Sequence, residues 1–211
     1  MRDKPAWIDI SVPLATGMPV YPGDPPVRIS RLSGGPEGEP FVSHLSFPAH
    51  AGTHVDAPLH FVSHGRGIEA MPLEAMEGPA RIIAVTGSAP ISVGHLEGQH
   101  VSQGERILFK TTNSTLWRLD SFAEDYVYLS TEAALFLAQR RVVTVGIDYL
   151  SIGGFGRNES EVHRILLEAG IWIIEGLDLG AGQPGPCDLL CLPLLTPGTE
   201  AAPARVMVRP R

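Results

Sequence analysis

The run His50-Ala51-Gly52-Thr53-His54-Val55-Asp56-Ala57-Pro58-Leu59-His60 is the densest stretch of ionisable residues in the chain. In an extended backbone its even-numbered residues, which include all three histidines and the aspartate, point to one side. A straight strand would nevertheless hold the Cα atoms of His50 and His54 roughly 13 Å apart, too far for both imidazoles to reach one metal ion. The sequence therefore predicts a bend between them at Gly52, where a positive φ costs least. A helix would also bring the two histidines together, but the central glycine and Pro58 disfavour it.

The residue types in this run suit a metal site. Two imidazoles (His50 and His54) and one carboxylate (Asp56) form a ligand set that fits Zn²⁺ or Mn²⁺ and leaves positions open for water and substrate. The alternative is that these are ordinary surface or hydrogen-bonded side chains. The H-x-x-x-H-x-D spacing with a glycine at the required bend favours the metal site.

A second candidate pair, His163 and Glu175, lies far along the chain. His163 falls near the start of a predicted helix, and Glu175 follows the apolar residues 171–174. A helix followed by an antiparallel return would place the two side chains side by side. A buried Glu175 needs a partner, which could be a metal ion, Arg164 or a backbone amide.

The rest of the chain predicts a strand-rich α/β fold. Apolar alternation and β-branched residues predict strands at 7–12, 27–32, 41–47, 81–86, 106–111, 142–147, 171–174, 187–192 and 205–208. Helices are expected at 131–140, capped by Thr131, and at 159–169, capped by Asn158. The odd positions of Phe41, Leu45 and Phe47 predict a half-buried strand. These elements indicate an α/β layered domain with a mixed sheet.

Composition limits the function. The 211 residues fit one domain, residues 1–211. The chain is 44% hydrophobic and 18% charged, and this composition excludes a disordered chain. The formal net charge of −7 and the absence of a basic run argue against nucleic acid as a partner. No apolar run could span a membrane or act as a signal peptide, so a cytoplasmic protein with no membrane partner is expected. The two cysteines, Cys187 and Cys191, are expected to be buried thiols.

At residues 50–60 the sequence resembles the cyclase family of metal-dependent hydrolases, which includes bacterial kynurenine formamidases (arylformamidases). His50, Gly52, Thr53, His54, Asp56, Pro58 and His60 meet the family signature H-x-G-T-H-x-D-x-P-x-H without departure. The resemblance continues through residues 7–11, 21–25, 146–148 and 163–175.

The resemblance implies a fold, a metal site and a reaction. The implied fold is a swivelling β/β/α-type domain in a homodimer or higher homo-oligomer. The implied metal is Zn²⁺, one or two per subunit, or Mn²⁺. His50, His54 and Asp56 would hold the first ion, and Asp56, His163 and Glu175 the second. The implied reaction is hydrolysis of a small amide, best matched by N-formyl-L-kynurenine. Alternatives are a ring-opening amidase or lactonase, such as one acting on isatin, and a non-catalytic protein that binds a metal or another ligand.

Two further positions bear on the chemistry. His60 lies outside the implied ligand set and is the candidate general acid or base, with a fourth ligand or a structural hydrogen bond as its alternatives. Tyr21 stands where kynurenine formamidases commonly carry tryptophan, which makes it a candidate substrate-binding residue. Asp24 and Asp148 are expected to support the site or only to stabilise turns.

Overall fold

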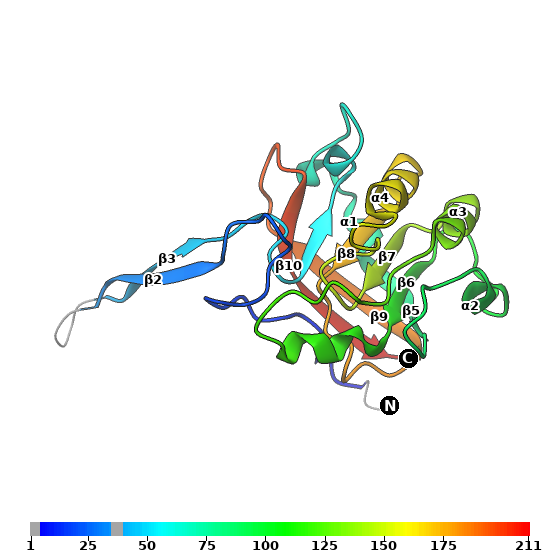
Figure 1. Cartoon of the computed structure of the whole chain (residues 1–211), viewed down its shortest axis with the longest axis horizontal. Coiled ribbons are helices and arrows are strands. Elements are labelled where there is room, and N and C mark those ends of the chain that lie inside the picture. The colour runs from blue at the N-terminus through cyan, green and yellow to red at the C-terminus, as the bar shows by residue number, and fades with distance from the viewer. Residues whose placement is uncertain (1–4, 35–39) are drawn as a thin grey trace.

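The computed structural model describes residues 5–34 and 40–211, and the chain there forms a strand-rich mixed α/β fold, as expected (Figure 1). The strands are β1 (Ile8–Asp9), β2 (Arg28–Ser33), β3 (Val42–Ser46), β4 (His54–Asp56), β5 (Glu77–Ala84), β6 (Arg106–Lys110), β7 (Thr144–Ile147), β8 (Trp172–Glu175), β9 (Gly185–Pro193) and β10 (Ala201–Pro210). The α-helices are α1 (Leu73–Met76), α2 (Gly94–Glu97), α3 (Thr131–Gln139) and α4 (Glu159–Glu168). Three 3-10 helices are η1 (Pro58–His60), η2 (Ile68–Ala70) and η3 (Thr112–Arg118).

The main sheet closes on itself. Its strands follow the order β10-β4-β8-β7-β6-β5-β9, and β10 then pairs with β9 as well. Strand β10 can do this because residues 204–210 pair with β9 while residues 201–203 pair with β4. Strands β5 to β8 run parallel, and β4, β9 and β10 run antiparallel to their neighbours. The closed sheet leaves two apolar faces to cover, one inside and one outside.

Each face has its own core. The inner cluster includes Val55, Leu108 and Ile174, whereas the outer cluster includes Ile107 and Ile173 together with buried residues of α3 and α4. Neighbouring residues in a strand point to opposite faces. Because Val55 faces the interior, its neighbours in β4 face outward, toward the layer that contains α4. The site is therefore built on the outer face of the sheet.

Both predicted helices are present, with different caps. Ser130, rather than Thr131, caps α3: its hydroxyl accepts a hydrogen bond of 3.2 Å from the N–H of Ala133. Asn158 precedes α4 but makes no capping hydrogen bond to it. Its side-chain oxygen accepts instead from the N–H of Gly154, at 3.0 Å. Since serine and threonine both cap well, the pattern predicted the start of α3 only to within one residue.

The expectation of a half-buried strand at residues 41–47 is wrong. Strands β2 and β3 form a two-stranded hairpin that projects from the main sheet (Figure 1), and every residue of both strands is exposed. Phe41 is 68% exposed and Leu45 is 55% exposed. The alternation of apolar residues predicts that one face of a strand is apolar. It does not predict whether another part of the same chain covers that face.

The N-terminal strand is shorter than the sequence predicts. The strand predicted at residues 7–12 is reduced to β1, with one isolated bridge between Ser11 and Leu177. Cys187 and Cys191 are buried free thiols, as predicted. Among the helices that the structure describes, none is long and apolar enough to cross a membrane.

Candidate metal centre

Five segments bring the predicted site residues together on the outer face of the sheet. Strand β4 supplies His54 and Asp56, and β8, paired antiparallel with it, supplies Glu175 directly opposite His54. His163 comes from α4. His50 lies in the turn before β4, and His60 is the last residue of η1, just after β4.

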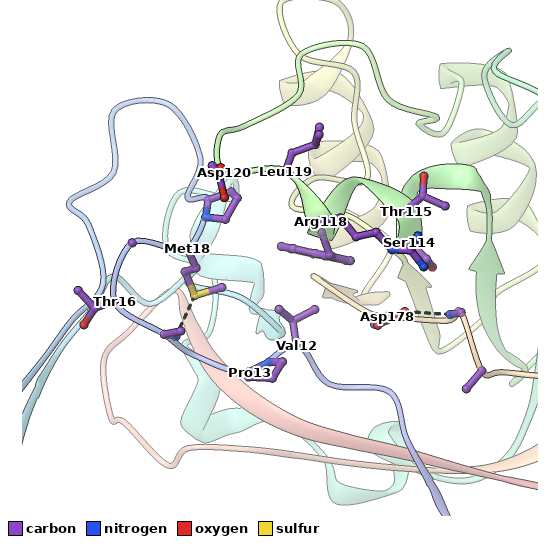
Figure 2. A pocket seen from close by; sticks show the side chains of 16 residues that line it. Val12, Pro13, Thr16, Met18, Ser114, Thr115, Arg118, Leu119, Asp120 and Asp178 are labelled. Carbon is purple, nitrogen blue, oxygen red and sulfur yellow. Dashed lines mark hydrogen bonds between the residues drawn. The ribbon is translucent and has the colours of Figure 1, made fainter.

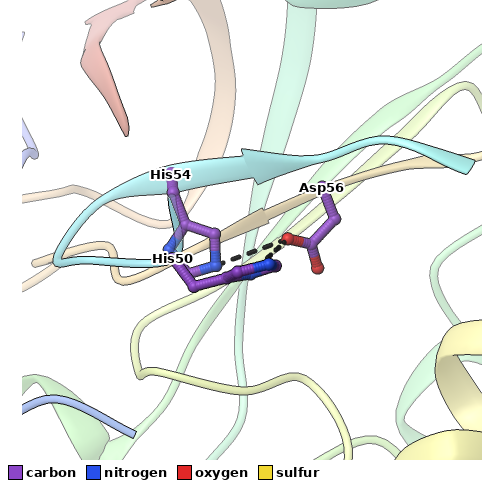
Figure 3. A group of neighbouring side chains, drawn as sticks. All are labelled: His50, His54 and Asp56. Carbon is purple, nitrogen blue, oxygen red and sulfur yellow. Dashed lines mark ion pairs between the residues drawn. The ribbon is translucent and has the colours of Figure 1, made fainter. Parts of the chain in front are cut away.

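His50, His54 and Asp56 converge on one point (Figure 3). His50 Nδ1 lies 3.1 Å from Asp56 Oδ1, and His54 Nε2 lies 3.4 Å from the same oxygen. The predicted bend is present, because Gly52 has φ of 60° and the two imidazole centres are 5.0 Å apart. These three residues can hold one metal ion.

The bend is held by a close backbone contact. A Cβ atom on Gly176, which has φ of 70°, would lie 1.9 Å from the carbonyl oxygen of Gly52. Thr53 sits at the same crossing: its hydroxyl donates to the carbonyl of Gly176 at 2.5 Å and accepts from the N–H of Val12 at 2.7 Å. The site therefore depends on two glycines packed backbone to backbone.

His163 and Glu175 meet as the sequence predicted. His163 Nε2 lies 3.0 Å from Glu175 Oε1 and 3.7 Å from Asp56 Oδ2. The other carboxylate oxygen of Glu175, Oε2, lies 3.3 Å from His54 Nε2, and Oε1 also accepts from the N–H of Ile152 at 2.7 Å. Arg164, the alternative partner considered from the sequence, is not in an ion pair with Glu175.

Backbone carbonyls fix the protonation of two imidazoles. His54 Nδ1 lies 2.9 Å from the carbonyl oxygen of Gly52, and His163 Nδ1 lies 2.8 Å from that of Glu159. A carbonyl oxygen only accepts, so each Nδ1 carries the proton. With a metal bound, each ring would direct the lone pair of Nε2 toward the ion beside the carboxylates. This is the arrangement of a metal-ligating histidine, with the second nitrogen oriented by a backbone carbonyl.

The donor atoms fit a cation. Within the described residues, His54 Nε2 and both carboxylate oxygens of Asp56 are buried without a hydrogen-bond partner. Burial raises the pKa of Asp56, but His60 and His50, when protonated, outweigh it and hold that pKa well below its usual range. Burial lowers the pKa of His163, yet the charge of Glu175 raises it overall to about 9. Both pKa shifts show that positive charge is stabilised at this position. A divalent metal bound by nitrogen and oxygen ligands would supply that charge.

His60 lies against both halves of the cluster. Its ring centre is 4.3 Å from that of His50 and 5.6 Å from that of His163. Asp56, His60 and His163 form a second group whose donor atoms could hold a metal. Burial lowers the pKa of His60 below its usual value, which favours the neutral ring. The geometry is compatible with both a proton-transfer group and a ligand.

A cavity of about 270 Å³ opens onto the cluster. Its lining residues are Tyr21, Asp24, His50, His60, Phe61, Leu150, Ser151, Glu159, His163 and Glu175. Phe61 stacks on His163 with ring centres 4.8 Å apart, and Tyr21 packs edge-on against Phe122 and Phe155 at 5.3 and 5.7 Å. The cavity thus has aromatic side chains on two sides, and Tyr21 is one of them.

A larger cavity, of about 630 Å³, lies between residues 12–19 and η3 (Figure 2). Its lining includes Arg118, Asp120 and Asp178 but none of the histidines or carboxylates predicted for the site. The larger of the two cavities is therefore not the one beside the candidate metal ligands.

The two additional aspartates have different surroundings. Asp148 is buried, and its carboxylate accepts hydrogen bonds from the backbone N–H and hydroxyl groups of Thr111 and Ser114. These hydrogen bonds stabilise the start of η3, and none of them is to a candidate metal ligand. Asp24 closes a turn through a 3.0 Å hydrogen bond from its N–H to the carbonyl of Tyr21, and it also lines the site cavity.

Sequence reasoning did not single out three residues beside the cluster. Glu200 Oε1 lies 3.4 Å from His50 Nε2, while Ser151 and Glu159 line the cavity. Glu200 precedes β10, whose first residues pair with β4, so only the closed sheet brings it near His50. Isolated serine and glutamate residues carry no pattern that marks them as functional.

Known proteins resemble this chain over nearly its full length. The Cyclase family model matches residues 8–153. Kynurenine formamidase from Bacillus cereus is 33% identical over 97% of both chains, and that from Bacillus mycoides is 32% identical with the same coverage. A solved structure of a predicted metal-dependent hydrolase from Bacillus stearothermophilus superposes with a TM-score of 0.85 at 33% identity, over 98% of both chains. Isatin hydrolase A from Labrenzia aggregata shares the fold, with a TM-score of 0.84 at 20% identity over 97% of this chain and 93% of its own.

Proposed function

The chain belongs to the Cyclase family of metal-dependent hydrolases, and we propose that it hydrolyses the formyl amide of a small arylamine, with N-formyl-L-kynurenine as the best-matched substrate. The observation that carries this proposal is the set of buried donor atoms of His54 and Asp56, which have no hydrogen-bond partner within the described chain and lie beside an aromatic-walled cavity. The curated relatives named above support the choice of substrate.

In this proposal His50, His54 and Asp56 hold one divalent ion, Zn²⁺ or Mn²⁺. Asp56, His163 and Glu175 would hold a second ion where two are bound. When bound, the metal supplies Lewis acidity toward the acyl oxygen and lowers the pKa of the attacking water. The Nδ1–H bonds to the carbonyls of Gly52 and Glu159 keep the Nε2 atoms of His54 and His163 oriented as ligands.

His60 moves the proton in this mechanism. Its neutral ring, favoured by burial, accepts a proton from water as the water oxygen attacks the formyl carbon. The C–N bond then breaks, and His60 returns the proton to the departing nitrogen. The products are formate and the free arylamine, so no covalent intermediate with the protein is required.

The cavity walls suit an aryl substrate. Phe61 and Tyr21 offer apolar ring surfaces, and a bound aromatic ring would pack against them with an offset or edge-on geometry. The cavity volume of about 270 Å³ fits a single substituted benzene ring rather than a large polycyclic or polymeric substrate.

The proposal includes a homodimer. The β2–β3 hairpin exposes Ile29, Leu32 and Leu45 on a projecting arm, and exposed apolar side chains gathered in this way commonly mark a protein interface. A second copy of the chain is the occupant that the resemblance to dimeric family members favours.

A substrate panel tests the function. The protein, loaded with Zn²⁺ or Mn²⁺, is assayed with N-formyl-L-kynurenine, 2-formamidoacetophenone, isatin and a simple lactone. Faster turnover of the two formyl amides supports the proposal. Preferred turnover of isatin or the lactone would assign the ring-opening alternative, and metal binding without any turnover would assign the non-catalytic one.

A further inference from the structure

The lining of the site cavity contains two carboxylates besides those of the candidate metal ligands. Its ten lining residues include Asp24 and Glu159 in addition to the candidate ligand Glu175, and none of the ten is a lysine or an arginine. Neither Asp24 nor Glu159 makes an ion pair with another described residue. Apart from the proposed metal ions, the cavity therefore offers a substrate carboxylates and no lysine or arginine.

Glu159 is fixed in position beside the metal cluster. It is the first residue of α4, and its backbone carbonyl accepts the Nδ1–H of His163 at 2.8 Å. Its side-chain carboxylate lines the cavity at the N-terminus of this ten-residue helix. Burial, together with a hydrogen bond to Glu159, raises the pKa of Tyr21, so the neutral phenol donates to that carboxylate. The carboxylate is thereby held at the cavity wall while retaining capacity to accept further hydrogen bonds.

A buried hydroxyl gives an independent sign that polar substrate groups enter this cavity. Ser151 is 2% exposed and lines the same space, and its hydroxyl lies beside the phenol of Tyr126 but makes no hydrogen bond of good geometry within the described chain. An unpartnered buried hydroxyl costs free energy unless a ligand or an ordered water completes it. The cavity is thus built to receive a polar substrate rather than an apolar ring alone.

We propose that Glu159, assisted by Asp24, binds a protonated amino group of the substrate and so makes the enzyme selective for formyl arylamines with an ammonium-bearing side chain. This inference rests on the proposed function and adds a substrate feature to it. An ammonium group matches an ionised carboxylate through charge-assisted hydrogen bonds. A carboxylate on the substrate would be repelled by Glu159 and Asp24 and should point away from these two side chains.

Four related substrates test the inference. They are 2-formamidoacetophenone, the same anilide extended by a protonated amine, the same anilide extended by a carboxylate, and N-formyl-L-kynurenine, which carries both groups. Wild-type protein should give a kcat/KM at least about tenfold higher for the amine-bearing anilide than for the carboxylate-bearing one, the usual worth of a hydrogen bond to a charged group. Glu159→Gln should abolish most of that ratio, chiefly through KM.

Glu161→Gln is the matched control. Glu161 lies in the same first turn of α4 but outside the cavity lining, with its carboxylate accepting a 2.9 Å hydrogen bond from Thr131. This variant should keep the wild-type ratio. Tyr21→Phe, which removes the phenol that positions Glu159, should reduce the ratio partially.

The outcomes separate the inference from the function. If the wild type hydrolyses the neutral anilide but shows no preference for the amine, or if Glu159→Gln lowers kcat/KM equally for all four substrates, the inference is overturned and the proposed function stands. If no formyl anilide is hydrolysed by the metal-loaded wild type, the proposed function fails and the inference falls with it.

Discussion

His54 and Glu175 stand directly opposite each other in the antiparallel register of β4 and β8, with His54 Nε2 3.3 Å from Glu175 Oε2. The two residues are far apart in the sequence, so the pairing of the two strands, and not local spacing, joins the halves of the candidate metal centre. A change of one residue in this register would turn one of the side chains to the other face of the sheet. The contacts that fix the register are therefore as important to the site as the donor atoms.

The close contact between Gly52 and Gly176 predicts the most sensitive backbone position. Gly176→Ala would place a Cβ 1.9 Å from the Gly52 carbonyl oxygen and also strain a positive φ, so unfolding free energy should fall by roughly 2–4 kcal/mol. Gly170→Ala is the matched control, because Gly170 has φ of 76° with open space around its Cβ position, and it should cost only about 1 kcal/mol. Urea denaturation measures both. Equal losses would mean that the contact does not hold the site.

Replacement of His60 separates proton transfer from ligation. If His60 transfers protons, His60→Ala should reduce kcat by about 10²- to 10⁴-fold while metal content stays near the wild-type level. Rate and metal content should be measured on one preparation. Loss of metal, with partial recovery of activity in excess Zn²⁺ or Mn²⁺, would make His60 a ligand instead.

Much of the site could be predicted from residues 50–60 alone, because the ligands there are close in sequence and only one backbone feature, the bend at Gly52, was needed to join them. His163 and Glu175 could be placed beside each other from helix and strand lengths. Their approach to Asp56 could not be derived in this way, since it depends on the pairing of β4 with β8. Ser151, Glu159 and Glu200 enter the site through tertiary contacts that leave no local pattern.

The fold could be predicted at the level of class and of most strands. The closure of the sheet could not, because it depends on β10 pairing with β9 along one part and with β4 along another. The hairpin shows a different limit. Its alternation of apolar residues was recognised, but in this chain no described element covers that face.

Burial makes specific predictions for the two cysteines. It raises the pKa of Cys187 to about 11 and that of Cys191 further. The thiolate is the reactive form, so at pH 8 neither residue should be alkylated by iodoacetamide in the folded protein, whereas both should react in denaturant. Mass spectrometry counts the adducts. Rapid modification of the folded protein would show that the strand β9 opens readily.

The exposed hairpin predicts a variant with altered assembly. If the β2–β3 arm contacts a second copy of the chain, Leu45→Ser should lower the dimer affinity with little effect on the unfolding of the monomer, since Leu45 is 55% exposed in the single chain. Leu195→Ser, at a residue that is 77% exposed outside the hairpin, is the control. Light scattering coupled to gel filtration measures the mass. A wild-type monomer, or an unchanged dimer in Leu45→Ser, would contradict this assignment.

The buried carboxylate of Asp56 and the imidazoles around it are proposed to hold a divalent metal. The most direct measurement is metal content by plasma mass spectrometry on wild type, Asp56→Asn and the exposed control Asp120→Asn, after identical dialysis against Zn²⁺ or Mn²⁺ and removal of free ion. Wild type and Asp120→Asn should retain at least one ion per chain, and Asp56→Asn should retain about tenfold less, because the amide removes the charge that offsets the metal. Wild-type protein without bound metal, or full occupancy in Asp56→Asn, would show that Asp56 does not hold a metal ion.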